Sequence, residues 1–116
     1  MKLSGANLAG TSTTRDRVEN DFYATDPSST KALLERHSFN GKNFLEPCCG
    51  QGHITKVVQE FYPDVQIDSI DISDRGFGQT GIDFLTWQTD KRYDSIITNP
   101  PYSLAQEFVE KSLTLL

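Results

Sequence analysis

Runs of strand length alternate with helical patterns along most of this chain, and this alternation restricts the fold more than any other feature of the sequence. The expected strands cover residues 43–46, 65–72, 82–85 and 93–98, and the expected helices cover about 26–37, 54–61 and the stretch from 103 onward. Such alternation favours a parallel sheet with helices packed on its faces. The sequence therefore predicts a three-layer α/β/α fold with a mostly parallel, incomplete sheet of four strands in the order 3-2-1-4.

Three local signals support the expected helices. Asp26 is a good N-cap, and Pro27 has a φ angle preset for the first helical position. Ser103 and Gln106 have the spacing of a capping box, which predicts the start of the last helix. The middle helix is predicted by an apolar stripe of helical period, formed by Ile54, Val57, Val58 and Phe61.

Length and composition limit the kind of protein this can be. A chain of 116 residues forms one domain at most. Residues 1–20 lack an apolar period and are expected to form a flexible arm, which leaves 21–116 as a partial domain. No apolar run approaches the roughly 20 residues of a membrane span, and no signal peptide is recognisable. We expect no membrane partner and a cytoplasmic location.

The cysteines and histidines do not suggest a metal or redox site. Cys48 and Cys49 are adjacent, so an ordinary disulfide between them would distort the backbone, and no ligand spacing typical of a metal site is present. We expect two small buried thiols in a reducing compartment and no bound metal. His37 and His53 lack a partner acid in a recognisable pattern and are assigned to surface or packing roles.

Charge is distributed unevenly. Residues 1–43 carry six basic and five acidic side chains, whereas residues 44–116 carry five basic and eleven acidic ones. An acidic segment cannot hold a phosphate backbone by itself. If the substrate is DNA, most of the basic surface that grips it lies outside this sequence.

A glycine-containing segment, Glu46–Gly52, joins the first expected strand to the next helix. Gly50 and Gly52 allow a ligand to approach the backbone at the positive end of that helix. The third glycine of the dinucleotide fingerprint is absent, because Thr55 occupies its place. Gly-x-Gly also occurs in plain turns, so this segment alone leaves both roles open.

Two acidic residues follow strands at positions suited to a nucleoside. Asp71 lies twenty-one residues beyond Gly50, where a carboxylate can accept hydrogen bonds from both hydroxyls of a ribose. Asp83 and Phe84 would offer an acceptor for an adenine amino group and an apolar wall. The alternative for each acid is an ordinary surface aspartate at a strand end.

The sharpest motif is Asn99-Pro100-Pro101-Tyr102, after the fourth expected strand. Two prolines fix φ twice, remove two N–H donors and force Asn99 out of the helical region. The Asn99 oxygen and the Pro100 carbonyl could then each accept one N–H of a planar amino group, with Tyr102 stacked on its ring. Such contacts would aim the nitrogen lone pair at an electrophile. The structural alternative is a plain Pro-Pro turn before a helix.

These residues resemble the amino-group methyltransferases that depend on S-adenosylmethionine, in which an NPPY or DPPY motif follows the fourth strand. The resemblance implies a Rossmann-like methyltransferase fold and catalytic roles for Asn99, Pro100, Pro101 and Tyr102. It also implies that Asp71 binds the cofactor's ribose and that Asp83 binds its adenine. The expected cofactor contacts in this part of the chain are Glu46, Pro47, Cys48, Gly50, Gly52, Asp71, Ile72, Asp83 and Phe84.

The upstream segment 22–27 resembles the part of N6-adenine DNA methyltransferases that lies against the methionine end of the cofactor, and it adds Tyr23 and Thr25 as expected contacts. It favours adenine N6 in DNA as the target, with the base flipped out of the duplex. The resemblance covers residues 22–103.

Two departures from the family pattern stand out. Cys48-Cys49 replaces the usual pair before Gly50, and the last three strands and a target-recognition segment are absent. We therefore expect a missing C-terminal region or a second chain to complete the sheet, and weak cofactor binding and poor turnover by this chain alone.

Three alternatives remain open. The acceptor could be a protein glutamine amide or guanine N2 in RNA, the chain could be a non-catalytic cofactor-binding remnant, or the fold could be another nucleotide-binding one with an incidental Pro-Pro.

Overall fold

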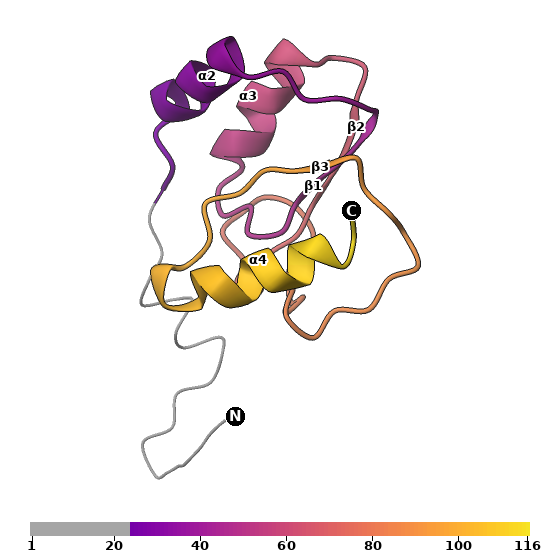
Figure 1. The fold of residues 1–116 in the computed structure, drawn as a ribbon. Helices are drawn as coiled ribbons and strands as arrows, with labels where there is room; N and C mark the ends of the chain where they lie inside the picture. The colour runs from indigo at the N-terminus through magenta and orange to yellow at the C-terminus, as the bar shows by residue number, and fades with distance from the viewer. Residues whose placement is uncertain (1–23) are drawn as a thin grey trace, which may run out of the picture.

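The computed structural model describes residues 24–116, so the expected arm at 1–20 lies outside the described residues. A parallel three-stranded sheet in the order β2-β1-β3 forms the centre of the described part (Figure 1). No helix of residues 24–116 is long and apolar enough to cross a membrane. The elements are α2 (Pro27–Arg36), β1 (Asn43–Glu46), α3 (His53–Phe61), β2 (Gln66–Ser69), β3 (Ser95–Ile96), a 3-10 turn (Tyr102–Leu104) and α4 (Ala105–Leu113).

Helices cover both faces of the sheet. Figure 1 shows α2 and α3 on one side and the yellow α4 on the other. The central strand explains this arrangement, because neighbouring residues of a strand point to opposite faces. Phe44 packs with Val57 and Val58 of α3, whereas Leu45 packs with Phe108 of α4, and both strand residues are fully buried. The three-layer arrangement predicted from the sequence is therefore observed.

The first two helices begin where the sequence predicts. The Asp26 side chain accepts a hydrogen bond from the Ser28 N–H at 2.9 Å and caps α2. In α3, Ile54, Val57 and Val58 are buried, while Phe61 at the end of the helix is 38% exposed. The apolar stripe thus faces the core over most of its length.

The expected third strand at 82–85 is wrong. The backbone of this segment forms local turns instead of pairing with β2. Asp83 Oδ1 accepts the Leu85 N–H at 3.0 Å, and the Asp83 carbonyl accepts the Thr86 N–H at 3.1 Å. An aspartate that bonds to the backbone two residues ahead competes with strand pairing. Beside β2 there is instead one isolated parallel bridge, between Ile70 and Gln79. Hence the order of the other three strands agrees with the expected 2-1-4, but the four-stranded order does not form in residues 24–116.

The second and fourth expected strands are present but shorter than predicted. The second pairs with β1 over Gln66–Ser69, and the fourth is reduced to Ser95–Ile96. Hydrogen bonds from Asp94 N–H to the Asn43 carbonyl (2.7 Å) and from Ile97 N–H to the Leu45 carbonyl (3.1 Å) fix the register of β3. The motif that follows β3 is thereby held at the same edge as the end of β1.

The last helix begins two residues later than the sequence predicts, at Ala105 rather than Ser103. The helix is entered through the 3-10 turn, Leu104 takes the N-cap position without a side-chain hydrogen bond, and Gln106 donates to Glu110 at 3.3 Å. Phe108 is buried as expected, but Val109, Leu113 and Leu116 are 57%, 66% and 55% exposed. One side of α4 therefore presents an apolar surface next to β3.

A glycine allows the turn that leads into β1. The carboxylate of Asp94, next to β3, accepts the backbone N–H groups of Lys42 (2.8 Å) and Asn43 (2.9 Å). Gly41 has a φ of +89°, and a Cβ there would overlap the Asp94 side chain. A side chain at position 41 would thus meet both backbone strain and a direct clash.

We predict that Gly41→Ala destabilises the fold more than Gly76→Ala. Both glycines have a φ near +90° (89° and 88°), but a Cβ at Gly76 has no atom within 4 Å. Strain alone should cost about 1–2 kcal/mol in each variant, and loss of the Asp94 contacts should add about 1–3 kcal/mol at position 41. Urea unfolding of the two variants measures the difference. Equal losses would show that Asp94 contributes nothing.

Candidate functional site

The glycine loop forms a sharp turn at the carboxyl end of β1. Gly50 and Gly52 have φ angles of +54° and +88°, which favour glycine. Gly52 is the N-cap of α3 and provides no side-chain hydrogen bond to the helix start. The first N–H groups of α3 are thus left for other partners, as in sites that bind negatively charged groups.

Asp71 holds this loop to the end of β2. One of its carboxylate oxygens accepts the Gly50 N–H at 2.8 Å, and the other accepts the Ser73 N–H at 2.9 Å. Its side chain is only 2% exposed. The expected ribose-binding acid therefore lies beside the glycine loop, and both of its oxygens contact backbone N–H groups.

Six of the expected cofactor contacts lie together. They surround a cavity of about 10 Å³, which has room for about one water molecule. Phe84 is almost fully buried, with its ring centroid 5.2 Å from that of Phe108. An adenine ring could enter only if the surrounding loops moved apart. The six residues are Pro47, Cys48, Asp71, Ile72, Asp83 and Phe84.

Glu46 is buried beneath the glycine loop. It is 1% exposed, and its Oε2 accepts the Cys48 N–H at 3.2 Å. Burial, together with the negative charge of nearby Asp71, raises the pKa of Glu46 from 4.5 to about 8. At neutral pH this carboxyl is thus mainly protonated and acts as part of the core.

The two adjacent cysteines are free thiols in the same environment. Burial and the charges of Glu46 and Asp71 raise the pKa of Cys49 to about 12 and also raise the pKa of Cys48. A thiol with a raised pKa is a poor nucleophile and a poor metal ligand. Cys49 is buried as expected, whereas Cys48 is only half-buried.

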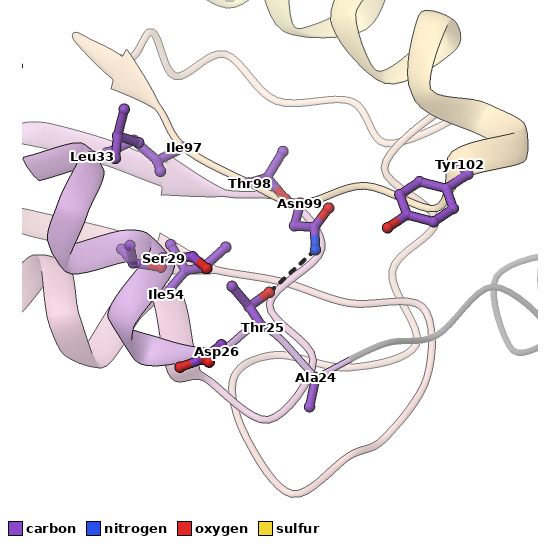
Figure 2. Close-up of a pocket in the computed structure, with 11 residues that line it drawn as sticks. Ala24, Thr25, Asp26, Ser29, Leu33, Ile54, Ile97, Thr98, Asn99 and Tyr102 are labelled. Atoms are coloured by element: carbon purple, nitrogen blue, oxygen red, sulfur yellow. Dashed lines mark hydrogen bonds between the residues drawn. The ribbon is translucent and has the colours of Figure 1, made fainter.

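A second, larger pocket lies at the carboxyl end of β3. Its volume is about 370 Å³, and Asn99 and Tyr102 of the proline motif line it together with Thr25 and Ile54. Figure 2 shows the Tyr102 ring across from Asn99, with its hydroxyl end directed toward the amide. The Tyr102 side chain is 69% exposed, so the aromatic face is accessible.

The two prolines shape this end of the pocket. Pro101 has a φ of −57° and precedes the 3-10 turn. The first hydrogen bond of that turn, from the Leu104 N–H at 3.0 Å, goes to the Pro101 carbonyl and not to that of Pro100. Asn99 and Tyr102 therefore project from a stiff connection.

Thr25 connects the proline motif with the glycine loop. Its hydroxyl accepts a hydrogen bond from Asn99 Nδ2 at 3.4 Å, and its carbonyl accepts one from His53 Nδ1 at 2.9 Å. His53 directly follows Gly52. The two expected parts of the site are thus neighbours in space.

Sequence reasoning missed several of the residues in this arrangement. The sequence predicts a surface or packing role for His53, yet the hydrogen bond from its Nδ1 to the Thr25 carbonyl holds the segment that contains Thr25. Its place directly after the second glycine, at the start of a helix, was the available signal. Other lining residues that no motif indicated are Ser29, Thr30, Leu33, Ile97 and Thr98. Tyr23 lies outside the described residues.

Comparisons with known proteins identify the class of enzyme that this chain resembles. It is 35% identical over 98 residues to the type II methyltransferase M.CvrRI of Paramecium bursaria Chlorella virus XZ-6E, a match that covers 76% of this chain and 26% of that protein. It is 31% identical over 75 residues to the ribosomal protein uL3 glutamine methyltransferase of Neisseria gonorrhoeae (strain ATCC 700825 / FA 1090), covering 52% of this chain and 25% of that protein. The chain spans about a quarter of the length of these curated relatives. No protein-family profile matches the chain.

Solved structures define the fold. The plantazolicin methyltransferase BpumL, in complex with SAH, superposes with a TM-score of 0.51 at 19% identity, over 78% of this chain and 39% of that one. The sugar N-methyltransferase KedS8 from Streptoalloteichus sp. ATCC 53650 superposes with a TM-score of 0.52 at 14% identity, over 100% of this chain and 55% of that one. The chain therefore has the Rossmann-like fold of methyltransferases.

We predict that Glu46→Gln removes a pH dependence of stability. Because the folded-state pKa of Glu46, about 8, lies above its ordinary value of 4.5, the folded protein holds this proton more tightly than the unfolded chain. The favourable contribution is complete below pH 4.5 and is lost as the pH rises toward 8. The slope due to this group should be on the order of 1 kcal/mol per pH unit. Urea unfolding between pH 5 and 8 should show the slope in the wild type and not in the variant.

The matched control is Glu60→Gln, which removes an exposed carboxylate of α3. It should keep the wild-type slope. A wild-type stability that rises across this pH range would contradict a protonated Glu46.

We also predict that the cysteines of the folded protein react slowly with a disulfide reagent. With a pKa of about 12 for Cys49, the thiolate fraction at pH 8 is on the order of one in ten thousand. Thiol titration at pH 8 should be slow for the native chain and fast in denaturant, and Cys48→Ser and Cys49→Ser would separate the two sites. Fast reaction of either thiol in the native chain would contradict the burial of this loop.

Proposed function

We propose that this chain is the cofactor-binding and amine-holding part of an S-adenosylmethionine-dependent methyltransferase. The observation that carries the proposal is the position of Asn99 and Tyr102, which line an open pocket and are joined through Thr25 and His53 to the glycine loop. A Pro-Pro turn that only connected two elements would not need this arrangement. The methyltransferase relatives and the bound SAH of one structural neighbour support the choice of cofactor.

The residues near Asp71 are of the chemical types that bind the parts of such a cofactor. The glycine loop offers backbone N–H groups at the start of α3, and Asp71 and Asp83 are acceptors suited to a ribose and an adenine. The hydroxyl of Ser73, next to Asp71, is buried and lacks a hydrogen-bond partner among residues 24–116. A buried hydroxyl without a partner is costly, so a ligand hydroxyl there would satisfy it.

The small size of the cavity at Asp71 requires a change of shape on binding. With about 10 Å³ available, the loop 73–83 would have to move away from Cys48 and Phe84. Glycines at 76, 78 and 81 all have positive φ, but Gln79 pairs with the end of β2 through the bridge to Ile70. Movement of the loop would break the backbone hydrogen bonds of Gln79 to Ser69 and Asp71 (both 2.9 Å), so opening the cavity carries a cost.

The chemistry needed from the protein is modest. When bound, the cofactor supplies an electrophilic methyl group on a positively charged sulfur. Asn99 Oδ1 and the Pro100 carbonyl would each accept one N–H of the acceptor amine, and the Tyr102 ring would stack on its planar group. These contacts orient the nitrogen lone pair, and positioning of this kind contributes a large share of catalysis in group transfer.

We further propose adenine N6 in DNA as the acceptor. The upstream segment that resembles adenine methyltransferases includes Thr25 and Asp26, and both residues line the pocket beside Asn99. The viral relative, a type II methyltransferase whose match covers 76% of this chain, supports this substrate. Because residues 44–116 are acidic, the surface that binds the phosphate backbone would belong to another part of the protein or a partner.

A glutamine amide is the second candidate acceptor. The glutamine methyltransferase relatives favour it, because a carboxamide also presents a planar amino group with two N–H donors. The exposed Tyr102 ring argues for the adenine, since stacking suits an aromatic base better than an amide.

Calorimetry and a transfer assay test the proposal. The chain should bind S-adenosylhomocysteine weakly, and Asp71→Asn should weaken binding further because it alters the loop contact at Gly50. Asn99→Ala should leave cofactor affinity close to that of the wild type but reduce methyl transfer by roughly a hundredfold. Transfer is measured with a labelled methyl donor offered DNA, RNA and protein in parallel.

The outcomes separate the alternatives. Label in protein or RNA but not in DNA would overturn the adenine assignment. Binding without transfer, even for a longer form of the protein, would indicate a non-catalytic remnant. The absence of S-adenosylhomocysteine binding would contradict the cofactor itself.

A further inference from the structure

The side-chain amide of Asn99 can hold an amine in only one of its two orientations. Its oxygen accepts hydrogen bonds, whereas its NH₂ group donates them. A rotation of the terminal bond by half a turn would therefore replace an acceptor with a donor and repel the N–H groups of the substrate. Asn99 is exposed and lies three residues beyond the end of β3, so strand pairing does not fix its side chain.

A hydrogen bond to Thr25 favours one orientation of the Asn99 side-chain amide. Asn99 Nδ2 donates to Thr25 Oγ1 at 3.4 Å, a long and exposed contact. Figure 2 shows the amide nitrogen directed toward Thr25 and the oxygen on the opposite side, nearer Tyr102. With the NH₂ group engaged, the Asn99 oxygen is the atom presented to a ligand.

Thr25 is itself anchored at two points. Its carbonyl accepts a hydrogen bond from His53 Nδ1 at 2.9 Å, which ties it to the first residue of α3. The next residue, Asp26, caps α2 through the Ser28 N–H at 2.9 Å. Thr25 is half-buried, while its neighbours Ala24 and Asp26 are exposed. Its hydroxyl therefore has a fixed place relative to both helices.

We propose that Thr25 is a positioning residue that fixes the amide of Asn99 with its oxygen facing the pocket. The sequence suggested a different role for Thr25, direct contact with the cofactor. The consequence of the orientation for methyl transfer rests on the proposed function, but the contact can be tested in the protein without cofactor or substrate.

The test is the nuclear magnetic resonance signal of the Asn99 side-chain NH₂ group in the ¹⁵N-labelled full chain, identified by its loss in Asn99→Asp. Thr25→Val keeps the shape of the side chain but removes the acceptor, and it should shift this signal and speed the exchange of the NH₂ protons with water. Thr25→Ser retains the hydroxyl and should restore the wild-type signal. Thr80→Val, at an exposed threonine that does not line the pocket, should leave the signal unchanged.

Several results would overturn the proposal. One such result is an Asn99 signal that is the same in Thr25→Val and in the wild type. Another is a signal that shifts equally in Thr25→Val and Thr25→Ser. Missing Overhauser contacts between the NH₂ protons and the Thr25 side chain would also count against it. If Thr25→Val folds poorly, as its backbone signals would reveal, Thr25→Ala removes the same hydroxyl and must give the same shift.

Calorimetry with S-adenosylhomocysteine distinguishes positioning from cofactor contact. Thr25→Val should change cofactor affinity less than about twofold. A loss of about tenfold or more with an unchanged Asn99 signal would instead assign Thr25 to the cofactor. If the wild type does not bind S-adenosylhomocysteine, the proposed function fails, while the resonance experiment still decides whether Thr25 holds Asn99.

Discussion

The buried carboxylate of Asp71 is the interaction on which the candidate site depends. It accepts N–H groups from Gly50 and Ser73 and so joins the glycine loop of β1 to the chain leaving β2. Backbone N–H groups at such a sharp turn cannot pair with each other, and a nearby anion satisfies them at close range. Burial raises the pKa values of Glu46, Cys48 and Cys49, and the negative charge of Asp71 adds to that effect. Asp71 thus fixes the geometry of the loop and contributes to the charge state of its buried groups.

The parts of the fold that follow from local patterns were predictable from the sequence. The N-cap at Asp26, the apolar stripe of α3 and the central strand Asn43–Glu46 each depend on neighbouring residues, and each is observed. The expected strand at 82–85 failed because the Asp83 side chain bonds to the Leu85 N–H, a contact that apolar spacing does not reveal. The last helix begins at Ala105 rather than at Ser103, because the prolines before it lead into a 3-10 turn.

The sequence was a better guide to which residues lie near one another in the candidate site than to the hydrogen bonds and burial of those residues. The motif residues cluster in two neighbouring places, at Asp71 and at Asn99. That Asp71 is already engaged by backbone, and that Phe84 is part of the core, depends on contacts between segments far apart in the chain. The role of His53 was hidden for the same reason, since its partner is a backbone carbonyl twenty-eight residues earlier.

The central position of β1 has a consequence for the way this protein reaches its folded state. One neighbour, β2, follows soon after β1 in the sequence, but the other, β3, begins only at Ser95. Closing so long a connection carries an entropic penalty before any sheet contact compensates for it. On a ribosome, the nascent chain would therefore hold an incomplete sheet, with one side of β1 unpaired, until residues well past the middle of the sequence have emerged. The pocket at Asn99 would form only after that stage, and α4 would follow it.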